Sequence, residues 1–505
     1  MSNFSSIRQR KMKRNKFNLS HEVKLSCDMA ELVPVYLDEI VPGDKFSVRS
    51  EALVRLAPLI SPIMHRVSVY IHYFFVPNRI IWDNWKDFIT GGEDGTYQNT
   101  IPKLTINESV KSFFAKGKLS DYLGIPAVDQ ASTVLGDHQI NSLPFRAYQE
   151  IYQEYYRDQN LQEKANWSKG DNSDSYLAAL TKMRTRAWEK DYFTSSLPWA
   201  QKGDPITAPI EMGFREPALF KTTPGGNLTD AGNISSLSDG RASHDVDGMV
   251  SIDNIDPQST GIDVNELRTA TKLQQWLEKN ARAGSRYVES ILAHFQERVP
   301  DYTADRPIYL GGGRQPVTIS EVLQTAETGT TAQGNMAGHG ISAGAKANFT
   351  SKFTEHGYVM GIMSVLPRTA YSQGTERKWT KSDKFDLYWP EFAQLGEQPV
   401  QNKELYLDYT DDTGLNDETF GYQARYAEYR QAQSRIAGDF RDNLAHWHLG
   451  RFFDSTPYLN STFIQADPRE DIFAVTNSEV DKLWVQVYNN VQALRRMPKY
   501  NVPSL

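Results

Sequence analysis

The residue types that could carry chemistry are few and scattered along the chain. The tripeptide "HWH" at 446–448 places His446 and His448 on one face if the segment is a strand, an arrangement that a metal ion could use. No third ligand lies at a telling spacing, so ordinary hydrogen-bonded histidines are the favoured interpretation. Cys27 is the only cysteine, which excludes an intramolecular disulfide and metal sites built from several cysteines.

A glycine-rich segment, "YLGGGRQPV" at 309–317, resembles a phosphate-binding loop only superficially. Such a loop needs G-x-x-x-x-G-K-[ST] before a helix, because the lysine and the hydroxyl reach the phosphates and the metal. Here Arg314, Gln315 and Pro316 follow the glycines, and the lysine and hydroxyl are missing. The segment therefore predicts a turn.

Acidic residues cluster in "DDTGLNDE" at 411–418 and in "SHDVDG" at 243–248. Both segments read as solvated loops or as Ca²⁺ ligands, although neither meets the strict D-x-[DN]-x-[DN]-G pattern. With no catalytic triad and no cofactor loop, the sequence predicts a protein that is not an enzyme and that has no cofactor and no metal site.

Two rival functional classes remain open at this point. A carbohydrate-active β-sandwich would need two carboxylates beside an aromatic cleft. Trp389 with Glu391, or Trp447 with Asp454, could form part of one, but their spacing does not single them out. A monomeric single-stranded nucleic-acid-binding protein is the other rival. The long insertions and the many aromatic residues argue against it.

The helices and strands that must position these residues belong to a large chain with enough hydrophobic residues to form a core. It has 505 residues, of which 39% are hydrophobic and 11% aromatic. This length predicts two or three domains, or one domain with very long insertions. No segment approaches the ~18 consecutive apolar residues of a membrane span. The N-terminus lacks the apolar run of a signal peptide. We therefore expect assembly in the cytoplasm, without membrane insertion.

Charge is distributed unevenly between the N-terminus and the rest of the chain. Residues 1–16 carry no acid and six basic residues, which are Arg8, Arg10, Lys11, Lys13, Arg14 and Lys16. Because the whole chain carries −7, the remainder carries −7 − 6 = −13. A basic arm on an acidic body is typical of proteins that contact phosphate, in a salt-dependent and largely sequence-independent way. The alternative is a frayed terminus with no partner, or one that only ties neighbouring subunits together.

Hydrophobic periodicity predicts β-rich ends around a helical middle. Strands are predicted over 20–77, with a buried strand ending at Pro77 and a short amphipathic helix over 78–89. Helices are predicted in 143–161, where aromatic residues form a stripe, and in two segments of 265–295. Residues 221–265 and 325–348 read as long loops of small and polar residues, and strand signals return over 349–480.

Aromatic residues are more numerous than one core requires, since the chain has 10 Trp, 25 Tyr and 23 Phe. Interface cores are enriched in these types and in Arg. We therefore predict large interfaces between chains. The candidate interface residues are Trp82, Trp85, Trp199, Tyr422, Tyr426 and Tyr429.

The same aromatic segments carry a family resemblance. "FFVPNRIIWDNWKDFITG", "DYFTSSLPWAQKG", "LRTATKLQQWLEKNARAGSRYVE", "RPIYLGGGRQPV", "FDLYWPEFAQLGEQ" and "RMPKYNVPSL" resemble the major capsid protein of the Microviridae, small tailless phages with circular single-stranded DNA. The resemblance is to the gokushovirus-type subfamily. It extends in order from about residue 20 to the C-terminus.

This resemblance implies a mainly β fold, an eight-stranded antiparallel jelly roll with long inserted loops that contain helices. It implies a basic arm at 1–19, a jelly-roll capsid domain at 20–505, and a surface insertion at 204–264 that forms a protrusion at the threefold axis and contacts a host receptor. The implied assembly is a T=1 icosahedral shell of about 60 copies.

The resemblance also implies partners and a location. The expected partners are other copies of the chain, the single-stranded DNA genome, a small basic DNA-packaging protein, a scaffolding protein and a host cell-surface receptor. The expected location is the virion, after assembly in the cytoplasm of a bacterial host. Arg495, Arg496 and Lys499 near the C-terminus would add to the positive charge that the arm offers to DNA.

Overall fold

The chain is described by a computed structural model that covers most of its length. The described residues are 13–128, 133–134, 136–204, 206, 220–222, 226–227, 235–236, 242–243, 250–252, 264–284, 286–323, 336–477 and 479–500. The chain divides into two compact units. The first comprises residues 1–198 and 284–505, and the second comprises residues 199–283.

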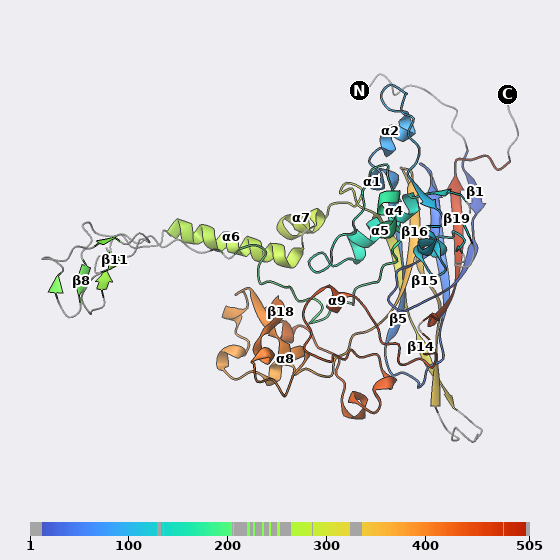
Figure 1. The fold of residues 1–505 in the computed structure, drawn as a ribbon. Coiled ribbons are helices and arrows are strands. Elements are labelled where there is room, and N and C mark those ends of the chain that lie inside the picture. Colours follow the sequence, from blue (N-terminus) through green and yellow to red (C-terminus); the bar gives the residue numbers. More distant parts are fainter. Residues whose placement is uncertain are drawn as a thin grey trace. The chain divides into compact units, whose positions relative to one another are not determined.

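Two antiparallel β-sheets form the centre of the first unit (Figure 1). The six-stranded sheet has the order β1-β19-β4-β15-β14, and β2 pairs with the other end of β19. Its strands are β1 (Asn15–Asn18), β2 (His21–Cys27), β4 (Lys45–Leu56), β14 (Thr318–Leu323), β15 (Met336–Lys352) and β19 (Leu483–Arg495). The four-stranded sheet has the order β13-β5-β16-β3, with strands β3 (Val33–Ile40), β5 (Val67–Pro77), β13 (Ile308–Pro316) and β16 (Gly357–Pro367).

The burial of each strand follows from how many of its faces are covered. β4, "KFSVRSEALVRL", alternates almost strictly between exposed and buried residues, as a strand with one face in water must. β5 and β16 are buried along nearly their whole length, because apolar side chains cover both faces of their sheet. The prediction of strands over 20–77 is confirmed, as is the mainly β, antiparallel character of the fold.

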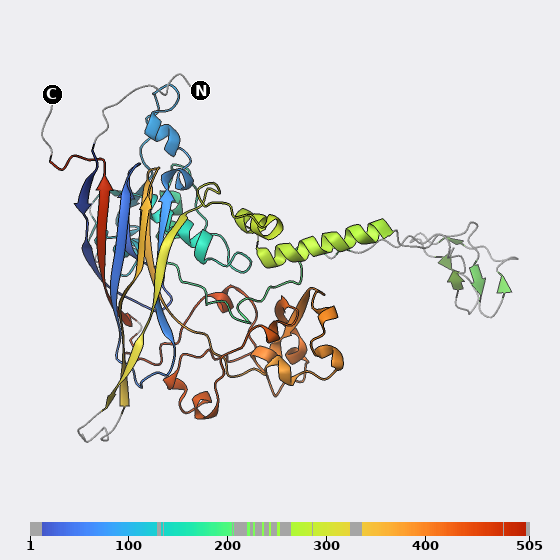
Figure 2. The ribbon, with the colours of Figure 1, turned by 180° about the vertical axis from the view of Figure 1, so that it is seen from behind.

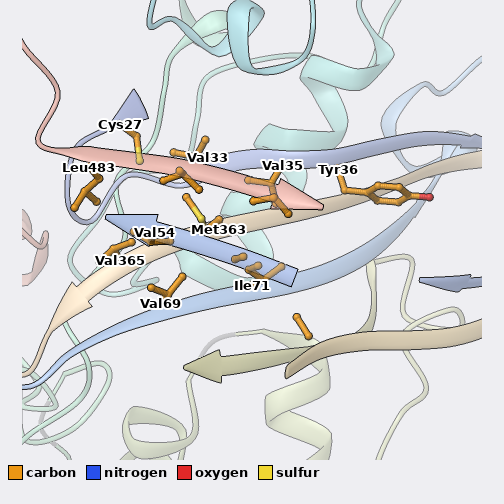
Figure 3. Packing of buried hydrophobic residues seen from close by; sticks show 14 of the residues in the cluster. Cys27, Val33, Val35, Tyr36, Val54, Val69, Ile71, Met363, Val365 and Leu483 are labelled. Atoms are coloured by element: carbon orange, nitrogen blue, oxygen red, sulfur yellow. The ribbon is translucent and has the colours of Figure 1, made fainter. Parts of the chain in front are cut away.

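The main core lies between the two sheets (Figure 3). Side chains from β2, β4 and β19 of one sheet meet side chains from β3, β5 and β16 of the other, including Val35, Val54, Ile71, Met363 and Leu483. Cys27 is buried in this core as a free thiol, and burial raises the pKa of that thiol well above its ordinary value. The thiol therefore acts as a small apolar group in this core.

A helical layer covers the other face of the four-stranded sheet, as Figures 1 and 2 show from opposite sides. The predicted aromatic stripe lies here. Phe145, Tyr148, Tyr152 and Tyr156 are all buried, so these rings of the stripe are part of the core of this layer. The predicted helix at 78–89 is interrupted at Trp82. The helices of the first unit are α1 (Asn78–Ile81), α2 (Trp85–Thr90), α3 (Leu119–Tyr122), α4 (Leu143–Ile151) with a π-helical turn at Tyr152–Tyr156, α5 (Leu177–Thr181), α7 (Tyr287–Phe295), α8 (Asn402–Leu405) and α9 (Ser461–Ile464).

Two long connections join strands of the sheets. One runs from β5 to β13 and includes β6 (Lys103–Ile106), β7 (His138–Asn141) and all of the second unit. The other runs from β16 to β19 and includes the hairpin of β17 (Glu397–Gln401) and β18 (Thr419–Ala424). Short 3₁₀ helices occur at Lys111–Phe114, Asp174–Tyr176, Arg377–Trp379, Lys384–Asp386, Pro390–Phe392, Leu415–Asp417, Ala427–Tyr429, Gly438–Arg441 and Ala445–Trp447.

The second unit holds the longest helix, α6 (Val264–Ala283), where a helix was predicted. Its short strands are β8 (Phe220–Thr222), β9 (Gly226–Asn227), β10 (Ser235–Ser236), β11 (Ala242–Ser243) and β12 (Val250–Ile252). Most of the predicted insertion at 204–264 lies outside the described residues. Across the described part of the chain, none of the helices combines the length and apolar character needed to cross a bilayer.

Several local predictions were wrong, and glycine explains two of them. The segment 309–317 is strand β13 with a bulge, not a turn, and residues 336–348 of the predicted loop belong to strand β15. A Cβ at Gly312 would lie 2.5 Å from the Ile71 carbonyl oxygen, and one at Gly338 would lie 2.7 Å from that of Ser61. Gly312 permits close approach of the neighbouring strand β5, and Gly338 permits close approach of the segment between β4 and β5. The strand signals at 384–396 and 461–478 also failed, since these segments contain 3₁₀ turns and α9.

Candidate nucleic-acid interface

The two predicted basic segments, at opposite ends of the sequence, are brought together by strand pairing. β1 pairs with the end of β19, so Asn15 lies opposite Arg495 and Lys16 lies opposite Leu494. The side chain of Asn15 donates a hydrogen bond of 2.7 Å to the carbonyl of Met497, which extends the contact beyond the ladder. The residues that carry basic charge near both chain ends therefore share one corner of the six-stranded sheet, which we call the terminal corner.

Arg495 anchors this corner from inside. Its Nε lies 3.0 Å from Oδ2 of Asp44, a nearly fully buried carboxylate. A second guanidinium nitrogen donates to the carbonyl of Glu39, and the guanidinium carbon lies 5.1 Å from the centre of the Phe46 ring. Arg495 therefore ties β19 to the turn between β3 and β4, which makes it a structural residue at the edge of the predicted basic site.

Two further guanidinium groups meet over that turn. Gly43 has a φ of 94°, which favours glycine, and a Cβ built there would lie 3.7 Å from Nε of Arg496 and 3.9 Å from Nη2 of Arg14. Arg496 is exposed and Arg14 is partly exposed, while Lys13, Lys16 and Lys499 are exposed. Arg8, Arg10 and Lys11 lie outside the described residues.

A row of lysines crosses the sheet beside these arginines. Leu494 of β19 lies between Lys16 of β1 and Lys45 of β4, and Lys45 lies opposite Lys352 of β15. Residues opposite one another in an antiparallel sheet share a face, and neighbouring strands lie about 4.8 Å apart. Across the described part of the chain, none of these three lysines has an ion pair. The terminal corner is thus a concentration of positive charge that an anion would stabilise.

Lys45 and Lys352 were not among the predicted basic residues. The alternation of "KFSVRSEALVRL" was a usable signal for Lys45, because it assigns Lys45, Arg49 and Arg55 to the exposed face of a half-buried strand. No local signal could place Lys352 beside Lys45, since that depends on the register of two strands far apart in the sequence.

The predicted interface aromatics occupy different environments. Trp82 has no exposed surface, and its indole nitrogen donates to Asp171 at 2.6 Å. Tyr426 is 3% exposed, whereas Tyr429 is 55% exposed, with the Lys381 ammonium 4.0 Å from its ring centre. The remaining candidates, Trp85, Trp199 and Tyr422, are partly exposed, and Trp199 belongs to the second unit. A ring with no exposed surface buries nothing more on association, so Trp82 and Tyr426 contribute to the core of the subunit.

Two residues whose types could carry chemistry, His448 and Ser342, have structural roles. His448 is buried, and its Nε2 lies 2.7 Å from the carbonyl oxygen of Phe440. Residues 340–344 match the spacing G-x-S-x-G, but Ser342 lies inside β15 and donates to the carbonyl of Pro316, instead of sitting at a strand-to-helix turn. No group of metal-ligating side chains occurs among the residues that the structure describes.

In the acidic loop at 408–418, the loop's own backbone amides satisfy the carboxylate of Asp411. Oδ1 of Asp411 accepts hydrogen bonds from the backbone amides of Thr413 and Gly414, and Oδ2 accepts one from that of Asn416. These bonds lower the pKa of Asp411 to about 2. The loop is an Asx-type turn held by its own backbone.

Comparison with known proteins gives matches over nearly the whole chain. A family model described as "Capsid protein (F protein)" matches residues 5–505. Capsid protein VP1 of Chlamydia phage 1 is 35% identical, over 99% of this chain and 97% of the relative. Capsid protein VP1 of Bdellovibrio phage phiMH2K is 35% identical, over 97% and 95%, and that of Spiroplasma virus 4 is 29% identical, over 99% and 97%.

Proposed function

Because the chain belongs to the phage capsid protein (F protein) family and is a structural capsid protein of the Microviridae, we propose that it forms a T=1 icosahedral shell of about 60 copies around a circular single-stranded DNA genome. Its role in this proposal is assembly, with no catalytic step. The mature location is the virion, after assembly in the cytoplasm of a bacterial host.

The proposed fold is the eight-stranded jelly roll, and strand order supports it. Without β1 and β14, the two sheets have the orders β2-β19-β4-β15 and β3-β16-β5-β13. Consecutive strands mostly alternate between the sheets, as in two interlocked Greek keys. β1 and β14 then extend this arrangement at two places.

The single observation that carries the DNA contact is the pairing of β1 with β19. It gathers Lys13, Arg14, Arg496 and Lys499 at the terminal corner, beside a row of lysines without ion pairs in the described chain. Each phosphate bound there releases counterions, so binding would weaken as salt rises. Arg8, Arg10 and Lys11, which precede the described residues, would extend the basic surface along the arm.

The remaining partners follow from the family and from exposed rings. A small basic packaging protein would share the negative charge of the genome, and a scaffolding protein would guide assembly. Tyr429, Trp85 and Tyr422 would contribute to contacts between copies. The insertion at 204–264 would form the threefold protrusion and contact a host receptor, so deleting 220–252 should leave closed shells that no longer attach to cells.

The test compares two sets of four neutralising substitutions in the full chain. The first changes Lys13, Arg14, Arg496 and Lys499 to Gln. The second changes four exposed basic residues elsewhere, Lys86, Lys164, Lys384 and Arg430, and matches the loss of charge. We expect the first set to form shells with less DNA, measured by the absorbance ratio at 260 and 280 nm, and the control set to package normally.

Two results would contradict the proposal. If shells of the first set had normal DNA content and normal salt sensitivity, the terminal corner would not bind DNA. If electron microscopy of the wild-type particles gave a subunit number far from 60, the T=1 assembly would be wrong.

A further inference from the structure

The exposed face of the six-stranded sheet carries an ordered pattern of side chains that capsid assembly alone does not require. Every second residue of β19 points to this face, beginning with Trp484 and including Tyr488 and Asn490. Trp484 is 46% exposed and Tyr488 is 37% exposed, although β19 has a paired strand on each side of both residues. We call this surface the open face.

The register places a cation beside the first ring and two carboxylates beside the second, because Tyr488 lies opposite Glu51 of β4 and opposite Glu22 of β2. Arg55 of β4 lies opposite Trp484, and Arg49 lies opposite Asn490. On the other side of β19, Lys24 of β2 lies opposite Gln486. Because outward residues repeat about every 6.8 Å along a strand, the two rings lie about 14 Å apart, with an amide side chain between them.

The charge of the open face is opposite to that of the whole chain. Its basic residues are Lys16, Lys24, Lys45, Arg49, Arg55 and Lys352, and its acidic residues on these strands are Glu22 and Glu51. Six minus two leaves +4 on this face, whereas the chain carries −7. Both acids are paired on the face itself, Glu22 with Lys24 at 3.3 Å and Glu51 with Arg49 at 3.9 Å. The other four cations therefore have no ion pair in the described chain and match a polyanion.

A hollow lies beside the first ring. A cavity of about 990 Å³ is lined in part by Trp484, Arg55, Lys24 and Gln486. It offers a space beside an aromatic ring, with Asp121 and Asp481 in its lining as well as these cations. The opposite face of the other sheet offers nothing similar, since apolar side chains of the helical layer cover it.

These features fit a single-stranded nucleic acid better than a duplex or a protein. Bases stack on exposed aromatic rings only when they are unpaired, and basic side chains then follow the phosphates. A contact with another protein would favour an apolar centre depleted of lysine and glutamate, whereas this face has charged side chains of both signs and amides around two rings.

We propose that the open face is a stacking platform for single-stranded DNA, in which bases stack on Trp484 and Tyr488 and phosphates bind Arg55, Lys45 and Lys352. This proposal rests on the proposed function, because it assigns the genome of the capsid as the ligand. The row of Lys16, Lys45 and Lys352 joins the open face to the terminal corner, so one strand of DNA could follow both.

The experiment measures binding of a fluorescein-labelled oligothymidylate to the full chain by anisotropy across a salt series. Trp484→Ala and Tyr488→Ala should each weaken binding by roughly 5- to 150-fold without changing the salt dependence. Trp484→Phe should retain most of the affinity. Arg55→Gln should lower the slope of log affinity against log salt by about one. Trp379→Ala, at a ring that is 73% exposed elsewhere, is the matched control and should bind normally.

The outcomes separate this proposal from the function on which it rests. Thermal melting of each variant identifies any loss of folding, and Trp484→Phe keeps the core contacts of the strand in place. If both alanine variants bind like the wild type while the four-residue variant of the terminal corner binds weakly, the platform is wrong and the DNA contact stands. If the four-residue variant of the terminal corner also binds normally, both the platform and the DNA contact at the terminal corner are wrong. If the alanine variants bind DNA normally but no longer form shells, the open face is a contact between proteins and the platform is wrong.

Discussion

Asn489 of β19 donates a hydrogen bond of 2.9 Å from its side-chain amide to the main-chain carbonyl of Val35 on β3. This bond crosses the main core from one sheet to the other. The side-chain oxygen of Asn489 accepts a hydrogen bond from Ser50, whose hydroxyl also accepts one from Tyr73. All three polar side chains are almost completely buried, so their hydrogen bonds fix how the two sheets face each other.

Replacing Asn489 by Ala should lower the free energy of unfolding by about 1–3 kcal/mol, because the Val35 carbonyl and the Ser50 hydroxyl would lose buried partners. Urea unfolding of the purified chain measures the change. Asn490→Ala, at the neighbouring exposed position, should change stability by less than about 0.5 kcal/mol. Equal effects of the two substitutions would show that the link between the sheets adds no stability.

Glu31 should make the folded chain less stable as pH rises. Burial, together with Asp28 and Asp481, raises the pKa of Glu31 from 4.5 to about 7, despite a hydrogen bond of 3.0 Å from the Asp28 amide. Between these values the folded state holds a proton that the unfolded state has lost, so stability falls as pH increases from about 4.5 to 7. Glu31→Gln should remove this loss and be more stable than the wild type by on the order of 1–3 kcal/mol at pH 8, with little difference at pH 4.5.

Melting temperatures from pH 4.5 to 8 test this sign directly. Glu93→Gln, the same change at an exposed position, controls for the loss of one negative charge. A difference between Glu31→Gln and the wild type that stays constant over this range would disprove the shifted pKa.

His72 should make the folded chain less stable as pH falls, which is the opposite of the effect of Glu31. Burial, and then the charge of Arg186, lowers the pKa of His72 to about 4, and the neutral ring lies with Nδ1 2.8 Å from the Tyr156 hydroxyl. As pH falls from about 6.5 to 4, the unfolded state gains a proton that the folded state does not, so stability declines. His72→Gln should be less stable than the wild type at pH 7, and this gap should narrow towards pH 4. His138→Gln, at an exposed position, should show no narrowing gap in the same urea titrations.

Gly312 should not tolerate a side chain, even though its φ is not in the left-handed region. A Cβ there would lie 2.5 Å from the Ile71 carbonyl oxygen of the neighbouring strand. Gly312→Ala should therefore destabilise the chain by about 1–3 kcal/mol. Gly170→Ala, where the new carbon would lie 3.5 Å from the Ser168 hydroxyl, should be neutral or slightly stabilising. A normal melting temperature for Gly312→Ala would show that β5 and β13 can separate at little cost.

Sequence periodicity predicted those elements whose burial follows a regular pattern. The alternation in β4 is such a case, because one face of the strand is covered, and so is the aromatic stripe that begins in α4, because its rings pack into the core of the helical layer. Glycine led to wrong predictions for β13 and β15, since the same residue type occurs both in turns and where a neighbouring chain segment approaches a strand closely. Which of the two applies depends on a neighbouring strand that the local sequence does not contain.

The basic character of both chain ends could be read from the sequence, but their meeting could not. The register of Asn15 against Arg495 joins residues from nearly opposite ends of the chain. The same limit applies to Trp484, whose exposed ring lies beside Arg55 only through pairing of β19 with β4. Long-range register was therefore the information missing from the candidate site.

The central position of β19 also means that the six-stranded sheet cannot be completed until translation is almost finished. β19 is the last strand made, yet it lies between β4 on one side and β1 and β2 on the other. At ~5–20 residues per second, roughly 20–85 s pass between the emergence of β4 and that of β19. During that interval the nascent chain has an incomplete sheet with open hydrogen-bonding edges, so ribosome-associated chaperones should shield it until translation is almost finished. A chain truncated before residue 483 should consequently aggregate, however complete its other strands are.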